Sequence, residues 1–321
     1  MPRPAKAGRF DIADIVRAHR SALEASVRLT TAQKRVLTDI AQCRTAALGG
    51  HVDRCLTCGY EHPSYNSCRN RHCPKCPALA QEKWIEERRA AQLDVRHFHV
   101  VFTLPAELRP LARFAPSIVY NALFQASQRT LLEFGQSRLG GTLGATLVLH
   151  TWTRALHFHP HIHAIVTGGA LSTDGARWHD ADRRYLFPVR AMGNVFRAKM
   201  LALLRRADRR HAFTGFAGFD DPDGFDRLMR RAARQTWNVY SKAPFKMGRH
   251  VLDYLGRYTH RVGIANSRLV KVTHDIVRFR TRNGAVEALA PVEFLRRLVL
   301  HVLPPSLHKL RHIGLYASAP R

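Results

Sequence analysis

The sequence predicts an α+β fold, in which an antiparallel sheet with covering helices follows a helical, cysteine-rich N-terminal module. All six cysteines of the 321-residue chain lie between positions 43 and 76. From residue 97 onward, apolar runs of strand length alternate with long helical patterns. No run of 18 or more apolar residues occurs, so we expect no membrane span. We therefore predict two domains, residues 1–94 and 95–321.

The charge of the chain predicts a polyanionic partner. Lys and Arg number 51 against 24 Asp and Glu, which gives a formal net charge of +27. Such a surplus on a folded protein attracts nucleic acid or an acidic membrane surface, but it does not indicate a reaction. A hydrophobic content of 45% excludes disorder along the whole chain. The basic N-terminus lacks the apolar segment of a secretory signal, so we expect the chain to stay in the cytoplasm, a reducing compartment.

The N-terminal module is predicted to begin with two helices within residues 10–42, each with an apolar stripe. Two CxxC pairs follow, and their spacing is close to that of a zinc ribbon. The predicted ligands of this structural zinc are Cys55, Cys58, Cys73 and Cys76. Disulfides are the alternative, but they are not expected in a reducing compartment.

Further metal ligands surround these pairs. A second zinc could be held by Cys43, His51, Cys68 and His72, with His62 as another candidate. The alternative is that the remaining cysteines pack as free thiols. Basic side chains lie among the ligands at Arg69, Arg71 and Lys75. Because four thiolates leave no open coordination position, such a loop suits phosphate contact better than catalysis.

A βαββαβ order of elements is predicted after a charged connecting helix over residues 78–94. The predicted strands are 97–104, 145–152, 161–167 and 237–241, and the predicted helices are 116–138 and 189–207. This is the order of the ferredoxin-like, RRM-like arrangement, in which the first and third strands are neighbours at the centre of the sheet.

The segment leading into the third predicted strand reads HFHPHIH, with a histidine at every second position. Strand side chains alternate between faces, so His161 and His163 point the same way, about 7 Å apart along the chain. They form a natural bidentate metal site, and a pair of surface histidines is the alternative. Ile162 and Ala164 should face the helices. Pro160 cannot donate to a ladder, so we expect the strand to begin near it.

A helix predicted over residues 251–261 places Tyr254 and Tyr258 one turn apart on one face. Arg257 and Arg261 lie on an adjoining face. Tyrosines at this spacing are more often core residues than nucleophiles. Combined with a histidine metal pair and a basic chain, however, they fit metal-assisted attack of a phenolate on a DNA phosphodiester. Motifs of P-loop enzymes, α/β-hydrolases and HExxH metalloproteases are absent from the sequence.

Other basic residues are candidates for DNA contact. Arg227, Arg231 and Arg234 recur at helical spacing on one face, and Lys242 precedes the tyrosine helix. A solvated charged face is the alternative interpretation of this run.

Taken in order, these blocks resemble the two-tyrosine HUH transposases of rolling-circle bacterial insertion sequences, family ninety-one of that nomenclature. The resemblance covers nearly the whole chain. It rests on CRTAALGGH at 43–51, SCRNRHCPKC at 67–76, FTLP at 102–105, HPHIH at 159–163, VYSKAPF at 239–245 and YLGRYTHR at 254–261. Because family members often continue further, a chain ending at Arg321 would be a short or truncated member.

The resemblance implies an HUH endonuclease core in which His161 and His163 hold one Mg²⁺ or Mn²⁺ ion. Tyr254 or Tyr258 would attack the scissile phosphate, which leaves a 5′-phosphotyrosine and a free 3′-hydroxyl. That link conserves the phosphodiester energy, so no nucleotide cofactor is expected. The implied partners are single-stranded DNA and transposon-end DNA, and the oligomeric state is not implied.

A third protein ligand should complete the catalytic metal site. His260, near the tyrosines, is the favoured candidate, and His97 and His99 on the neighbouring predicted strand are alternatives. Two other functions remain open at this point. One is a zinc-bearing DNA-binding protein without catalysis, and the other is a replication initiator or relaxase with the same chemistry.

Overall fold

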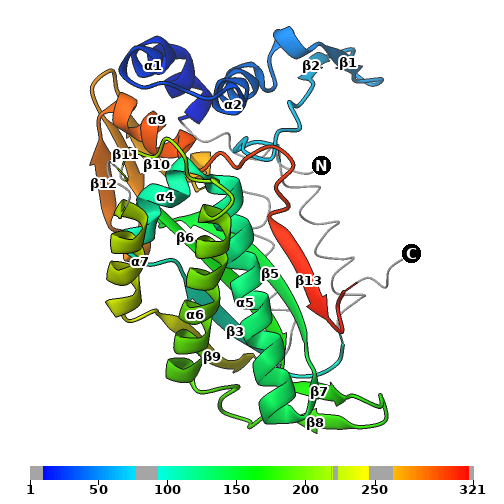
Figure 1. The fold of residues 1–321 in the computed structure, drawn as a ribbon. Coiled ribbons are helices and arrows are strands. Elements are labelled where there is room, and N and C mark those ends of the chain that lie inside the picture. Colours follow the sequence, from blue (N-terminus) through cyan, green and yellow to red (C-terminus); the bar gives the residue numbers. More distant parts are fainter. Residues whose placement is uncertain (1–9, 77–92, 218, 220–222, 246–262, 318–321) are drawn as a thin grey trace. The chain divides into compact units, whose positions relative to one another are not determined.

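The computed structural model describes residues 10–76, 93–217, 219, 223–245 and 263–317 (Figure 1). The predicted helix with Tyr254 and Tyr258 lies outside these residues, as do His260, Arg257, Arg261 and most of the predicted connecting helix.

The chain forms two compact units, each assembled from separate stretches of sequence. Unit 1 comprises Met1–Trp84, Trp152–Phe158 and His260–Pro305, and unit 2 comprises Ile85–Thr151, His159–Thr259 and Ser306–Arg321. The predicted division near residue 94 is a division into independently folding domains. The two compact units do not test independent folding, so this division stays a prediction.

Unit 1 combines two N-terminal helices, a hairpin and a later sheet with its helix. Its elements are α1 (Ile12–Ser26), α2 (Thr31–Gln42), η1 (Ala46–Leu48), β1 (Gly50–Arg54), β2 (Glu61–Tyr65), η3 (Asn266–Arg268), β10 (Leu269–Val272), β11 (Val277–Arg280), η4 (Arg282–Gly284), β12 (Val286–Leu289) and α9 (Pro291–Val299). Capping residues explain where the first helices begin. The Asp11 side chain accepts a hydrogen bond from the Ala13 N–H, and Thr30 and Gln33 form a capping box.

One apolar core holds unit 1 together across a long sequence separation. The predicted stripe of α1, which includes Ile12 and Ile15, is buried in the same core as Phe279 of β11 and Phe294 of α9. Polar contacts reinforce the packing, because the backbone N–H of Ile12 donates to Oδ1 of Asn266 at 3.1 Å. The two predicted N-terminal helices are confirmed, and their apolar faces pack against a segment more than 200 residues away in the chain.

Unit 2 is built on a five-stranded sheet. Its elements are β3 (His97–Thr103), η2 (Ala106–Leu108), α4 (Arg109–Phe114), α5 (Pro116–Leu139), β4 (Gly141–Thr142), β5 (Gly144–Trp152), β6 (Phe158–Thr167), β7 (Gly169–Ser172), β8 (Trp178–Asp180), α6 (Val189–Asp208), α7 (Gly224–Arg234), β9 (Val239–Phe245) and β13 (Leu310–Gly314). The strand order is β13-β5-β6-β3-β9, and the pairs β13–β5, β6–β3 and β3–β9 are antiparallel. The first and third predicted strands are therefore neighbours, and the predicted fold class is confirmed.

Several details of unit 2 differ from the prediction, which did not include α4, β4, β7 and β8. The fourth strand begins two residues later than expected, at Val239, and the edge strand β13 was not predicted. Strand β6 begins at Phe158, so Pro160 lies inside it. The register with β3 ends at the pair Thr103 and His161, so the missing N–H of Pro160 removes no bond from that part of the ladder.

The two faces of the sheet in unit 2 have different surroundings. Helices α5 and α6 cover one face (Figure 1), where Phe102 of β3 pairs with Ile162 and lies 5.1 Å from the ring of Phe196 in α6. Ile162 and Ala164 are fully buried, as the strand alternation predicts. His161 and His163 alternate with them and therefore point to the face opposite the helices. None of the described helices is long and apolar enough to cross a membrane.

Candidate metal centres

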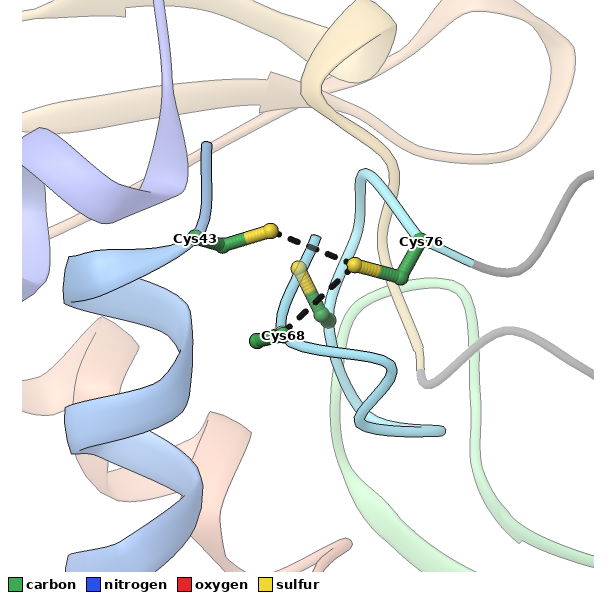
Figure 2. A group of neighbouring side chains, drawn as sticks. Cys43, Cys68 and Cys76 are labelled. Atoms are coloured by element: carbon green, nitrogen blue, oxygen red, sulfur yellow. Dashed lines mark hydrogen bonds between the residues drawn. The ribbon is translucent and has the colours of Figure 1, made fainter. Parts of the chain in front are cut away.

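Four thiols converge in unit 1. Cys43, Cys68, Cys73 and Cys76, called the cysteine cluster below, have sulfur atoms that all lie within 4.8 Å of one another. The Cys76 sulfur is 3.2 Å from that of Cys43 and 3.5 Å from that of Cys68 (Figure 2). Four thiolates at tetrahedral Zn–S distances of about 2.3 Å have sulfurs about 3.8 Å apart, so the cluster has the size of a zinc site.

Local structure brings these thiols together. Cys43 is the C-cap residue directly after α2, and the other three lie in the loop after β2. Asn70 shapes that loop, because its side-chain oxygen accepts the backbone N–H of His72 and its amide donates to Asp39 of α2. Cys43 and Cys73 are completely or almost completely buried, so the cluster forms part of the unit 1 core.

The protonation of the cluster indicates that it needs a cation. Burial raises the pKa of Cys68 to about 12 and raises that of Cys73 further. Burial also opposes ionisation of Cys76, but hydrogen bonds from Cys43 and Cys68 outweigh it and lower its pKa to about 7. Four thiolates side by side, two of them buried and two half-buried, are therefore stable only around a positive ion, and zinc is an ion that commonly occupies all-thiolate tetrahedra.

This grouping differs from the predicted one. Cys73 and Cys76 are present as expected, but their partners are Cys43 and Cys68, the predicted ligands of a second ion. Cys55 lies exposed at the end of β1 and Cys58 lies exposed in the turn after it. A CxxC spacing ensures only that its own two thiols lie near each other. Which other cysteines complete the site depends on the fold of the chain.

The two histidines assigned to a second zinc lie elsewhere. His72 is buried, and its Nε2 accepts the backbone N–H of Leu303 while its Nδ1 contacts Oδ1 of Asn70. Both nitrogens therefore have protein partners. His51 is exposed on β1, 3.5 Å from a carboxylate oxygen of Asp53.

The basic residues of the cysteine loop have different environments. Lys75 forms an ion pair with Asp11 at 2.8 Å, so its charge is less available to bind a phosphate. Arg69 and Arg71 are exposed, although Arg71 also lies within 3.4 Å of the Pro304 carbonyl.

Three imidazoles converge in unit 2. His150, His161 and His163, called the histidine cluster below, have ring nitrogens within 4.8 Å of one another. The Nε2 atoms of His161 and His163 are 3.0 Å apart. Nitrogen ligands of one ion at about 2.1 Å lie about 3.0 to 3.4 Å apart, so this separation fits a shared ion.

Hydrogen bonds fix the orientation of the two predicted ligands. Nδ1 of His161 lies 2.6 Å from the carbonyl oxygen of His159, so this nitrogen carries the proton and Nε2 keeps its lone pair. Nδ1 of His163 lies 2.7 Å from Nε2 of His99, which leaves Nε2 of His163 directed at His161. Metal-ligating histidines usually have their other nitrogen bound in this way.

Burial keeps the cluster in its ligating form. Desolvation lowers the pKa of His161 to about 4 and lowers the pKa values of His150 and His163 well below the usual range. Neighbouring histidines add to the effect. All three rings are therefore neutral near pH 7, which is the form that binds metal ions.

His150 is the residue that the sequence analysis missed. It lies in β5, with its ring centroid 4.3 Å from that of His163 and 5.4 Å from that of His161. The ferredoxin-like order places the second strand beside the third. A histidine of matching orientation in the predicted strand 145–152 was therefore the signal that would have found it.

The other candidates for a third ligand have separate positions. His99 contacts His163 but is not one of the three converging residues. His97 donates from Nδ1 to the Val95 carbonyl at 2.7 Å and accepts from the Tyr316 hydroxyl at 2.7 Å. His260 lies outside the described residues.

A basic, aromatic hollow of about 510 Å³ lies beside α7. Arg227 and Arg231 line it together with Phe216 and Phe219. The predicted arginine run is exposed on α7, and Lys242 is exposed on β9. Positive charge beside aromatic rings is the combination that single-stranded nucleic acid binds.

Comparison with known families assigns a class to these two clusters. A sequence model described as "Transposase zinc-binding domain" matches residues 15–104, which contain the cysteine cluster. A second, described as "Putative transposase", matches residues 144–321, which contain the histidine cluster. The chain is a transposase with a zinc-binding domain.

Individual relatives specify the family. The chain is 41% identical over 323 residues to the "Putative transposase y4qJ" of Sinorhizobium fredii, which covers 97% of this chain and 81% of that one. It is 29% identical over 303 residues to the transposase for insertion sequence element IS801 of Pseudomonas savastanoi pv. phaseolicola, with 88% and 70% covered. The chain belongs to the IS91 family of transposases, and the resemblance found in its sequence is confirmed.

Solved structures give a weaker likeness. The conjugative relaxase TrwC in complex with mutant OriT DNA matches with a TM-score of 0.27 and 15% identity, over 50% of this chain and 71% of that one. Its metal-bound complex with OriT DNA matches with a TM-score of 0.27 and 14% identity, over 51% and 71%. Likeness at this level carries no functional conclusion.

Proposed function

We propose that this transposase nicks and rejoins single-stranded DNA at transposon ends during rolling-circle transposition, with a tyrosine as nucleophile. The observation that carries this proposal is the histidine cluster, in which three neutral imidazoles, buried at His150 and His163 and half-buried at His161, converge on the sheet face opposite α5 and α6. Three protein ligands leave coordination positions for a substrate, and this distinguishes catalytic from structural metal sites. Such a protein would act on DNA in the bacterial cytoplasm.

The donor set is suited to a divalent ion. His150, His161 and His163 would hold Mn²⁺ or Mg²⁺, which when bound would polarise the scissile phosphate. Nitrogen donors favour Mn²⁺ over Mg²⁺, because Mg²⁺ prefers oxygen ligands and keeps its waters. We therefore expect stronger activity with Mn²⁺.

The proposed nucleophile is Tyr254 or Tyr258, on the strength of the sequence motif. Near pH 7 only about one phenol in a thousand is ionised, so the phenol needs a base or a nearby positive charge. As the bond between Oη and phosphorus forms, the bond from phosphorus to the 3′ oxygen breaks. The phenol proton leaves, and the 3′ oxygen takes one up as a hydroxyl. A second tyrosine would hold one strand while the other is cleaved.

Positively charged side chains would bind the DNA strand. The Arg109 guanidinium lies 2.8 Å from Nδ1 of His159, whose ring centroid is 5.2 Å from that of the cluster residue His161. A guanidinium in this position would neutralise charge on a bound phosphate. The arginines of α7, beside Phe216 and Phe219, would bind the flanking single strand.

An adduct assay tests the proposal. The purified protein is incubated with single-stranded transposon-end DNA and Mn²⁺, and a covalent protein–DNA adduct is expected. The combined change Tyr254→Phe and Tyr258→Phe should abolish the adduct. The matched control is Tyr60→Phe with Tyr185→Phe, since both of these tyrosines are exposed and distant in sequence from the motif.

Other results would change the assignment. No adduct with any divalent ion would favour a DNA-binding protein without catalysis. An adduct that survives the double change would reject both tyrosines. Tyr240 would then be the next candidate, because it is 58% exposed and pairs with Val101 on the histidine side of the sheet.

A further inference from the structure

The β1–β2 hairpin of unit 1 is exposed on both faces. All five residues of β1 are exposed, as are four of the five in β2. Val52 is 60% exposed and Leu56, at the tip, is completely exposed. An isolated two-stranded hairpin is marginally stable in water at best. A further interaction is therefore needed to keep this one folded.

One face of the hairpin collects metal-binding side chains. In the antiparallel register Asp53 pairs with His62 and His51 pairs with Ser64, and paired residues share a face. The register continues past the strands, because the backbone N–H of Cys55 donates to the carbonyl of Tyr60 at 2.8 Å. The face with Asp53 and His62 therefore also has Cys55, while the other face has none of these residue types except Glu61.

The turn places two thiols side by side at the tip. The backbone N–H groups of Cys58 and Thr57 hydrogen bond to the sulfur of Cys55, and the Cys58 thiol contacts it as well. The N–H of Gly59 donates to the Cys55 carbonyl at 2.9 Å, and Gly59 adopts a φ of +71°, which favours glycine. This is how a CxxC turn presents two sulfurs to one ion, with backbone N–H groups supporting the thiolate.

We propose that the β1–β2 hairpin binds its own zinc ion through Cys55, Cys58 and His62, with a carboxylate oxygen of Asp53 in the fourth position. The ion is separate from the one in the cysteine cluster. Thiolate, imidazole and carboxylate are the ligands that zinc accepts in tetrahedral sites. His51, 3.5 Å from Asp53, would orient that carboxylate from behind.

Binding of the zinc ion would bring the four ligands of the hairpin site together. Among the residues that the structure describes, these four side chains do not form a group within 4.8 Å, in contrast to the cysteine cluster. All four residues are exposed, so rotation about their side-chain bonds meets little resistance. The directly opposed pair Asp53 and His62 lies about 5 Å apart at Cβ, and Cys55 is the next residue on the same face.

The experiment counts zinc in the full-length protein and in variants purified in the same way. The wild-type chain should contain two zinc ions, and the combined change Cys55→Ser and Cys58→Ser should leave one. His62→Ala should weaken zinc binding at the hairpin about 10- to 100-fold or more, with His19→Ala as the control. Asp53→Asn should have a smaller effect of the same kind, with Glu61→Gln on the opposite face as its control.

Amide hydrogen exchange gives a second measurement that does not depend on activity. In the double serine variant the amides of Cys55 and Gly59 should lose protection, while those of α1 and α2 keep theirs. One zinc ion in the wild type, or two in the double serine variant, would overturn the proposal. Loss of both ions from that variant would also overturn it, because the hairpin thiols would then belong to the same site as Cys73 and Cys76.

Discussion

The cysteine cluster of unit 1 and the histidine cluster of unit 2 both bring metal ligands together, but they are suited to different roles. Each gathers donor atoms within 4.8 Å of one another, and each draws on more than one element. The cysteine cluster offers four thiols and lies in an apolar core. The histidine cluster offers three neutral imidazoles on the sheet face opposite α5 and α6. Four donors close a tetrahedral coordination sphere and hold the fold, whereas three leave room for a substrate.

The protonation of the two clusters shows the same contrast. Burial raises the pKa values of Cys68 and Cys73, so those thiols must release protons when the metal binds. Burial lowers the pKa values of the three histidines, so they are ready to bind at neutral pH. Burial therefore makes the cysteine cluster depend on its ion for charge balance. The same burial leaves the histidine cluster neutral and ready to bind an ion.

Removing zinc from the cysteine cluster should have the largest effect. Structural zinc in small domains contributes apparent binding free energies of about 10–16 kcal/mol, so unit 1 should lose most of its stability. Thermal unfolding followed by circular dichroism, before and after strong chelation, measures this. Cys73→Ser should reproduce the effect. A melting temperature of unit 1 that chelation leaves unchanged would refute a structural role.

Removing a ligand from the histidine cluster should affect chemistry and leave the fold intact. His161→Ala should slow formation of the DNA adduct by about 10³-fold, which corresponds to ~4 kcal/mol in the activation free energy. Zinc content and melting temperature should stay close to those of the wild type. The control is His179→Ala, whose ring contacts the Leu139 carbonyl. An unchanged rate would exclude His161 as a ligand.

Acidification should destabilise unit 2 through His97. This ring is fully buried, and burial lowers its pKa to about 4, below the unfolded value near 6.5. The neutral ring therefore stabilises the fold above pH 6.5, and this contribution of about 3 kcal/mol is lost as the pH falls toward 4. Urea unfolding at several pH values should give a flatter dependence for His97→Gln. Equal slopes for the variant and the wild type would contradict the prediction, and His274→Gln at an exposed position is the control.

Replacing His99 should have the smallest of these effects. Its Nε2 lies 2.7 Å from Nδ1 of His163 and so orients that ligand. Loss of such a partner typically weakens metal binding by 10- to 100-fold. His99→Leu should raise the Kd for Mn²⁺ by about this factor in calorimetric titrations, whereas His99→Gln keeps an acceptor and should retain most of the affinity. Identical affinities for both variants would show that the contact has no positioning role.

Local patterns predicted the two N-terminal helices of unit 1 and the main strands and helices of unit 2, whereas the β1–β2 hairpin and the β10-β11-β12 sheet with α9 were not predicted. Strand alternation fixed the direction of His161 and His163, and apolar stripes located α1 and α2. These inferences succeed because they depend only on neighbours in sequence. The short edge strand β13 was missed because its five residues, LRHIG, have no clear alternation.

Partners from distant parts of the chain were harder to predict. The third histidine required the pairing of β5 beside β6, and the cysteine grouping required the position of Cys43 at the end of α2. The packing of α1 against α9 joins residues that no local pattern connects. In each case the deciding information is a spatial neighbour, which a motif spacing does not contain.

The composition of unit 1 from three separate stretches also limits how this gene can change. A recombination break near codon 94 would separate α1 and α2 from β11 and α9, and each fragment would expose apolar side chains that are buried in the intact chain. After such a break α1 and α2 would need another apolar surface to pack against, so we expect exchange at this point to be rare. Selection should preserve the reading frame as one block, with tolerated insertions confined to exposed loops.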